Sequence, residues 1–287
     1  TNSDLAQKFF FFFLRLVYAF NHEEAIAAFT EASRLDPDAP MPYWGVALSL
    51  GPNINAAMDP KVEPRAVEAV QKATARLSQA TARERAYVEA LAARYSAKKS
   101  VTRKAKDEAY AKAMRQVARE APDDADAATI AAEAMMVLRP WDYWRADGRP
   151  QPGTEEILAI LEAALRQHPD HPGACHYYIH AVEASPDPQR ALDCAKRLPS
   201  LMPGAGHLVH MPAHIYMRLG RYREASERNA TAAMVDHEYL SRHPLEGNYA
   251  SGYYAHNLHF LNASLMMEGR SAEALQVARD LLVKVPA

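Results

Sequence analysis

The chain lacks the features that would place it in several common protein classes. It has only two cysteines, Cys175 and Cys194, which are too few for a disulfide framework. We interpret them as small buried residues that could face each other across a helix pair. No apolar stretch reaches the roughly 20 residues needed to cross a bilayer, so we expect no membrane span. We find no nucleotide-binding loop and no Gly-x-Ser-x-Gly elbow, so we assign no catalytic residue and leave enzymatic activity open.

Neither sign of charge is in excess. The 33 basic and 35 acidic side chains give a formal net charge of −2, which offers no reason to expect nucleic acid or an anionic membrane as a partner. The basic run from Lys98 to Lys106 is short, and we expect a solvated loop there. The sequence begins at Thr1 and not at Met, which is compatible with a cytoplasmic protein and with one exported after signal-peptide removal. We expect a soluble protein that binds no nucleic acid.

The chain is rich in alanine and in short recurring patterns. Hydrophobic residues make up 49% of it, and alanine favours close helix packing over strands. In the clearest unit, Leu219–Ala225 supplies a glycine turn and a small residue early in the next helix, and Asn229 and Ala232 follow. The segment Glu268–Ala274 repeats this pattern, and Pro286 closes it. Glycine makes the turn, small residues let two antiparallel helices approach closely, and proline ends the helix.

This pattern resembles the tetratricopeptide repeat (TPR), as found in TPR proteins of the bacterial type. The resemblance implies an all-α, right-handed superhelical solenoid of about seven helix-turn-helix pairs that fills residues 1–287 as a single domain, with its weakest match at 51–110. We expect the first helices near residues 6–20, 40–50, 83–96, 125–138, 173–184, 206–219 and 255–268. We expect the second helices near residues 22–35, 64–78, 105–120, 154–168, 188–200, 222–236 and 271–284.

Two aromatic insertions interrupt the repeat, at residues 139–153 and 238–254. In a solenoid such insertions form loops on one face, often the binding face. The five phenylalanines of Phe9–Phe13 fit poorly in an amphipathic helix, which needs only one apolar face. They could form a hydrophobic contact for another chain, or they could be an error in the sequence, and we favour an error. The last helix keeps enough apolar surface to need a neighbour, so we expect further C-terminal repeats, a missing cap or a homo-oligomeric contact beyond Ala287.

The histidines follow the repeat. His176 and His180 recur 34 residues later as His210 and His214, and 34 residues is the TPR period. Another pair recurs with an offset of 49 residues, which is that period plus an insertion of about 15 residues. In TPR proteins the second, fifth and ninth places of each first helix face the concave groove. The resemblance puts seven histidines at these places: His176, His180, His207, His210, His214, His256 and His259.

Seven imidazoles in one groove indicate a metal site. Imidazole is the commonest protein ligand for transition metals, and a zinc site needs three or four donors about 2 Å from the ion. Neighbouring first helices lie roughly 10 Å apart, so side chains from two of them can meet. We expect copper or zinc, with iron as an alternative. Pro212 lies inside the sixth first helix and predicts a kink that aims His207 and His210 differently from His214.

Further groove residues are weaker candidates. Glu183 is one turn beyond His180 and could be a ligand or orient an imidazole. The other candidates for the groove or for supporting contacts are Tyr177, Tyr216, Trp44, Glu133, Trp141 and Trp144. The two last tryptophans could form a lid, but for the tryptophans and Glu133 we favour ordinary packing.

Two functions are therefore compatible with the sequence. In the first, a histidine-built site for a divalent transition metal serves metal-dependent ligand binding or metalloenzyme chemistry, acting on a small molecule. In the second, the groove binds a peptide or a protein partner without metal, as most TPR proteins do. The peptide-binding grooves of the family carry lysine, arginine and asparagine at places where this chain has histidine, which favours the first function.

Overall fold

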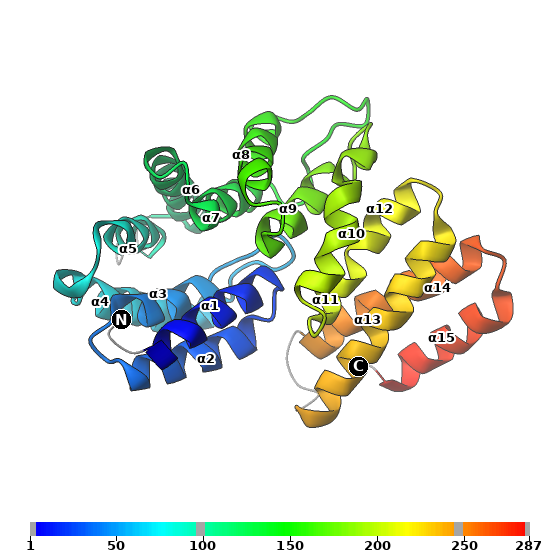
Figure 1. Cartoon of the computed structure of the whole chain (residues 1–287), viewed down its shortest axis with the longest axis horizontal. Helices are drawn as coiled ribbons and strands as arrows, with labels where there is room; N and C mark the ends of the chain where they lie inside the picture. Colours follow the sequence, from blue (N-terminus) through cyan, green and yellow to red (C-terminus); the bar gives the residue numbers. More distant parts are fainter. Residues whose placement is uncertain (1–3, 96–100, 244–248, 285–287) are drawn as a thin grey trace. The chain divides into compact units, whose positions relative to one another are not determined.

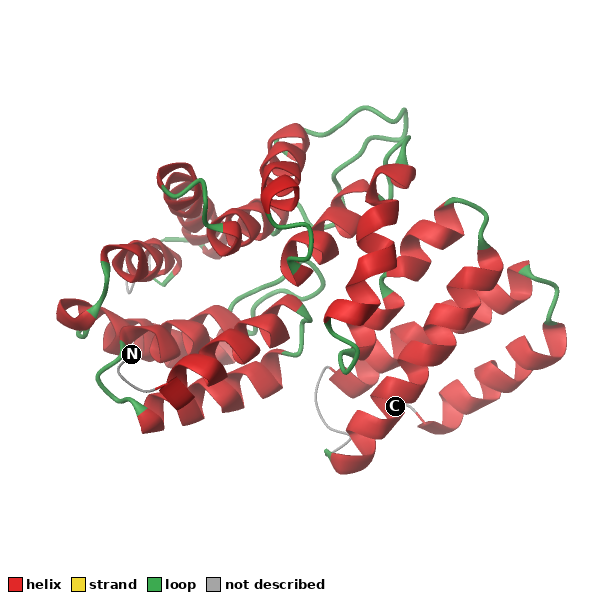
Figure 2. Ribbon diagram, viewed as in Figure 1, coloured by secondary structure: helices red, strands yellow, loops and turns green. Residues whose placement is uncertain are grey.

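The protein is described by a computed structural model that covers residues 4–95, 101–243 and 249–284. These residues form fifteen α-helices joined by turns and short 3₁₀ segments, and no β-strand occurs among them (Figures 1 and 2). The chain divides into two compact units, Thr1–His168 and Pro169–Ala287, called unit 1 and unit 2 below. No helix in the described ranges is both long and apolar enough to cross a membrane. The predicted all-α class is confirmed.

Unit 1 consists of four successive helix pairs. They are α1 (Asp4–Tyr18) with α2 (His22–Leu35), α3 (Pro40–Ser49) with α4 (Glu63–Thr74), α5 (Ala82–Arg94) with α6 (Arg103–Glu120), and α7 (Ala125–Met136) with α8 (Thr154–Gln167). Side-chain caps start several of these helices; Thr81 and Glu84 form a reciprocal capping box at α5. Each observed helix matches a predicted one within a few residues, including those in the weakly matching stretch 51–110.

Small residues let the helices of unit 1 approach closely. A Cβ atom on Gly45 would lie 2.5 Å from the Phe29 ring, so only glycine lets α3 pack this closely on α2. Phe10 and Phe13 of the phenylalanine run also contact Phe29, at ring-centroid distances of 5.6 and 5.8 Å. Phe12 is 60% exposed, and the side chains at 9 and 11 lie outside the described residues. Phe13 therefore belongs to the packed core, and the partly buried Phe10 ring packs against it through Phe29.

Unit 1 also buries a set of charged side chains. Arg94 is 1% exposed, lies over the Tyr110 ring at 3.9 Å, and has Nε 3.2 Å from Asp107 Oδ1. Lys106 Nζ lies 2.7 Å from Glu63 Oε1 and is buried, so the expectation of a solvated basic run is wrong at this residue. Residues 98–100 of that run lie outside the described ranges. Opposite charges are thus paired within the helix layer.

Unit 2 contains three helix pairs, the second of which has a divided first helix. The pairs are α9 (Pro172–Val182) with α10 (Leu192–Leu201), α11 (Gly206–His210) and α12 (Pro212–Arg218) with α13 (Tyr222–Arg242), and α14 (Ala255–Met267) with α15 (Ser271–Lys284). Pro212 divides the sixth first helix as predicted, because its ring removes a backbone donor. Cys175 and Cys194 are buried and unbridged, and a hydrogen bond between the two thiols raises the pKa of Cys194.

The second insertion is more helical than predicted. Helix α13 runs on to Arg242, and residues Tyr249–Tyr254 form a π-helical turn directly before α14. Asp236, buried on α13, accepts hydrogen bonds from Tyr249 Oη at 2.8 Å and Asn257 Nδ2 at 2.6 Å. These contacts connect α13 to the π-helix and to α14. In the first insertion, Trp144 and Pro150 form an isolated β-bridge, and Trp141 is 47% exposed.

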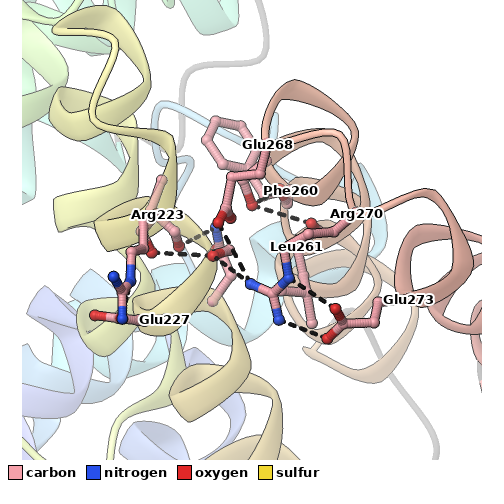
Figure 3. Close-up of polar contacts among 11 residues, drawn as sticks. Arg223, Glu227, Phe260, Leu261, Glu268, Arg270 and Glu273 are labelled. Atoms are coloured by element: carbon pink, nitrogen blue, oxygen red, sulfur yellow. Dashed lines mark hydrogen bonds and ion pairs between the residues drawn. The ribbon is translucent and has the colours of Figure 1, made fainter.

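The last helix pair is connected to α13 through the α14–α15 turn. Figure 3 shows the Arg270 guanidinium next to Glu268 and Glu273, and its Nε donates to Glu273 Oε1 at 2.7 Å. Its Nη1 also reaches Ser226 Oγ of α13, at 3.5 Å. Exposed ion pairs of this kind contribute little to the free energy of unfolding, so we expect these contacts to add little to the stability of unit 2.

The pKa of Glu133 predicts how stability depends on pH. Burial raises this pKa from 4.5 to about 7, against the opposing effect of Arg94. A group whose pKa is raised in the folded state stabilises the fold below its unfolded pKa, and this contribution is lost as the pH rises through the folded value. The difference in free energy of unfolding between Glu133→Gln and wild type should therefore shift by about 3 kcal/mol in favour of the variant as the pH rises from 4.5 to 8. Urea unfolding at several pH values measures this difference. Glu108→Gln, at an exposed position, should show no such trend, and parallel curves for both variants would contradict the prediction.

A second prediction concerns the contact between α11 and α13. A Cβ atom on Gly206 would lie 1.9 Å from Asp236 Oδ1, inside a packed region. We expect Gly206→Ala to lower the free energy of unfolding by about 1–3 kcal/mol because Asp236 must move away from its two donors. Gly204→Ala is the matched control, since nothing lies within 4 Å of its Cβ position. Equal thermal stability of the two variants would show that the close approach is not a constraint.

Candidate metal centre

Six of the seven predicted histidines converge within unit 2. They form two groups of three, and in each group the potential ligand atoms lie within 4.8 Å of one another. The first group, called group A, is His176, His180 and His207. The second, called group B, is His210, His214 and His256. Helix α9 supplies two members, α11 supplies two, and α12 and α14 supply one each.

The histidines on the two sides of Pro212 are grouped differently from the prediction. Met211, between α11 and α12, keeps helical backbone angles, φ −50° and ψ −36°. His210 and His214 therefore stay one helical turn apart on the same face, and their rings are in contact. His207, one turn earlier, joins the α9 histidines instead: its Nε2 lies 3.1 Å from His176 Nε2. The expected separation of His207 and His210 from His214 is therefore wrong, because the boundary between groups falls between His207 and His210.

In group B two of the three rings form a hydrogen bond from Nδ1 to an oxygen acceptor. His210 Nδ1 lies 2.6 Å from Asn229 Oδ1, and His214 Nδ1 lies 2.6 Å from Glu183 Oε2. The Asn229 amide is oriented because its Nδ2 donates to the Ala225 carbonyl at 2.8 Å. Amide and carboxylate oxygens only accept, so both imidazoles carry their hydrogen on Nδ1.

The consequence is a close contact between two acceptor atoms. His210 Nε2 and His214 Nε2 lie 2.8 Å apart. With the hydrogens on Nδ1, each Nε2 presents a lone pair to the other, and this arrangement is repulsive unless a proton or a cation lies between them. Held imidazoles with inward-facing lone pairs are the usual arrangement of metal-binding histidines.

Glu183 connects the two groups. Its Oε1 lies 2.9 Å from His180 Nδ1 in group A, while Oε2 contacts His214 in group B. Burial acts to raise the pKa of this carboxyl, but attraction to His214 and hydrogen bonds from both imidazoles outweigh burial and lower the pKa below its ordinary value. The group is therefore an ionised carboxylate, and the prediction of Glu183 as a residue that orients imidazoles agrees with its position.

Four of the six imidazoles have lowered pKa values, which favours their neutral form. Burial, followed by repulsion from neighbouring histidines, lowers the pKa of His207 and of His210 well below 6.5. Burial also lowers the pKa of His180, and it lowers that of His256 to about 4. Neutral imidazole is the form that binds metals, so protons compete weakly for these nitrogens near neutral pH.

Aromatic side chains surround the groups. Phe260 lies against His210, His214 and His256 at ring-centroid distances of 4.9, 4.6 and 5.1 Å, and Tyr253 lies 4.8 Å from His207. An apolar wall excludes water and strengthens electrostatic interactions inside the site. Sequence reasoning missed Phe260, Tyr253 and Asn229. Only Asn229 had a visible signal, an amide at a repeat place where a small apolar residue usually packs.

The remaining predicted residues have other surroundings. His259 is exposed and belongs to neither group. Tyr177 is buried with its ring 5.2 Å from His176, while Tyr216 packs against Ala213 and Ala225. The others belong to unit 1: Trp44, Glu133, Trp141 and Trp144. Among these, Trp44 Nε1 donates to the Tyr87 carbonyl at 3.2 Å, which is ordinary core packing.

Comparisons with known proteins give a limited result. No family model matches the chain, and no curated protein matches it. Two solved structures of the human IFIT1 dimer, one with m7Gppp-AAAA and one with PPP-AAAA, share 14% identity with it. Each match covers 92% of this chain and 68% of the other, with TM-scores of 0.44 and 0.42. The helix pairs of this chain are TPR-like in arrangement, while membership of the TPR family itself is not confirmed.

These comparisons also correct one expectation. Net charge led us to exclude nucleic acid as a partner, yet both similar helical structures are complexes with nucleic-acid ligands. A balanced total charge does not describe how charge is distributed over a surface, so it is no basis for that exclusion. The exclusion is withdrawn. At this identity and TM-score, the similarity assigns no ligand to the present chain.

The hydrogen-bond pattern of group B can be tested without any metal. Nitrogen-15 NMR of metal-free protein at pH 7.5 should show His210 and His214 with hydrogen on Nδ1, because Asn229 and Glu183 accept it. Asn229→Ala should abolish the preference at His210 and leave His214 unchanged. Hydrogen found on Nε2 of either ring in wild type would contradict the assignment.

Proposed function

We propose that unit 2 binds a divalent transition metal through its clustered histidines, and that the metal serves ligand binding or catalysis. The observation that carries the proposal is the pair of Nε2 atoms of His210 and His214, 2.8 Å apart with both Nδ1 atoms held by acceptors. A cation between them turns a repulsive contact into two favourable bonds. Two nitrogens that each lie about 2.0–2.1 Å from the same ion are roughly 2.9 Å apart when the nitrogen–metal–nitrogen angle is a right angle. They are about 3.3 Å apart when that angle is tetrahedral.

The donor set favours zinc or copper, with iron as a further candidate. All six converging donors are imidazoles, which suit these metals, while magnesium and calcium prefer oxygen ligands. The neighbouring thiol of Cys175 points elsewhere, since its Sγ contacts the Pro169 carbonyl at 3.6 Å. Sulfur therefore takes no part in the proposed site.

The number of ligands supports a working site more than a structural one. Structural zinc sites have four protein ligands, whereas catalytic ones have three and keep a position open for water or substrate. Each group supplies three imidazoles. A metal held in this way can act as a Lewis acid or activate a bound water.

Metal analysis and thermal unfolding test the proposal. We expect the purified chain to contain close to stoichiometric zinc, copper or iron, and the metal-free chain to gain several degrees in melting temperature when metal is restored. His210→Ala combined with His214→Ala should lower metal affinity at least 100-fold while the helical circular dichroism persists. His237→Ala, on the exposed face of α13, is the matched control and should bind as wild type does.

Two results would contradict the metal proposal. One is a chain that purifies without metal and neither binds added metal tightly nor gains thermal stability from it. The other is a double variant that binds metal as tightly as wild type. Either result would favour the alternative in which the protein binds a peptide or protein partner.

A further inference from the structure

The six converging imidazoles are more than one ion can use. A zinc or copper ion in a protein binds about four ligands, and the six nitrogen donors are already divided into two groups of three. We infer that each group holds its own ion, which makes the site a dinuclear centre, and that the two ions share a small anionic ligand. This inference rests on the proposed function and specifies it further.

The two groups are close enough to act together. Rings from different groups lie side by side: His180 and His214 at a centroid distance of 5.4 Å, and His207 and His210 at 5.8 Å. Glu183 binds one imidazole of each group, with a different carboxylate oxygen for each. Charge placed in one group is therefore felt in the other, both directly and through this carboxylate.

Charge balance indicates what else is bound. Two divalent ions bring four positive charges, and the six neutral imidazoles offset none of them. Glu183 is the carboxylate in contact with the described imidazoles, and it supplies a single negative charge. Burying an uncompensated charge is costly, so anions from outside the chain must accompany the metals.

An oxygen anion between the ions meets this requirement. With three imidazoles each, both ions keep open positions, and paired ions in hydrolytic enzymes commonly use such positions for a shared oxygen ligand. The chemical class is therefore hydroxide or the oxygen anion of a small phosphate or carboxylate. Entry is expected near His256, which is half-buried, because the other five imidazoles are at most 5% exposed.

Stoichiometry separates this inference from the proposed function. Metal-free protein titrated with Cu(II) should bind two ions per chain. His176→Ala with His207→Ala should leave one ion, and so should His210→Ala with His256→Ala, because each pair disables one group. His237→Ala is again the control and should keep two. Circular dichroism is measured for every variant, and if an alanine pair unfolds, the wild-type stoichiometry and the spin count described next decide.

Paramagnetic resonance tests whether the ions share a ligand. Two coupled Cu(II) ions in wild type should give well under two spins per chain, while each single-group variant should give one full spin. Azide, a small anionic probe, should bind wild type at least tenfold more tightly than either variant.

Three results would contradict the proposed function, the second ion or the shared ligand. No bound copper ends the proposed function as well as this inference. One ion per chain, lost to either pair of substitutions, ends the inference and leaves a single metal site. Two ions with two full spins and equal azide binding in all variants show two independent sites with no shared ligand.

Discussion

Three hydrogen bonds hold imidazoles of unit 2 at their Nδ1 atoms, and the proposed function depends on them. Glu183 holds His180 and His214, and Asn229 holds His210, each through Nδ1. An imidazole fixed at one nitrogen has its other nitrogen fixed in direction as well. These contacts therefore turn the Nε2 atoms of group B toward each other, and they keep the lone pairs there. Without these acceptors the rings could turn or change tautomer, and the cluster would be ordinary aromatic packing.

The helix pairs supply the closeness that this arrangement needs. First helices α9, α11, α12 and α14 bring imidazoles from three repeats together, while the second helix α13 supplies Asn229 from behind. Gly206 lets α11 approach Asp236, and Asp236 in turn holds the π-helix and α14. Burial then lowers the pKa of His207 and His210, so the packing that gathers the rings also keeps them neutral.

Repeat spacing in the sequence was enough to predict the helix pairs and all six converging histidines, together with a seventh that does not converge. The spacing also indicated Glu183 as an acceptor, but not Asn229, because this partner of His210 comes from a second helix and a groove pattern concerns first helices alone. It also placed His259 wrongly. Residues three apart on a helix differ in direction by about 60°, and residues four apart by about 40°. On α14 the face shared by His256 and Phe260 meets group B, and His259 points to solvent.

The two units bury polar groups in opposite ways, and the difference explains why the metal proposal concerns unit 2. In unit 1, Arg94 lies beside Asp107 and Lys106 beside Glu63, so buried charges of opposite sign neutralise each other within the chain. In unit 2, like groups lie together: the Nε2 atoms of His210 and His214 are 2.8 Å apart, while both Nδ1 atoms are held by oxygen acceptors. The first arrangement balances its charges with side chains of the chain itself. The second brings like atoms together, and the metal ion that we propose for this place would lie among four further imidazoles.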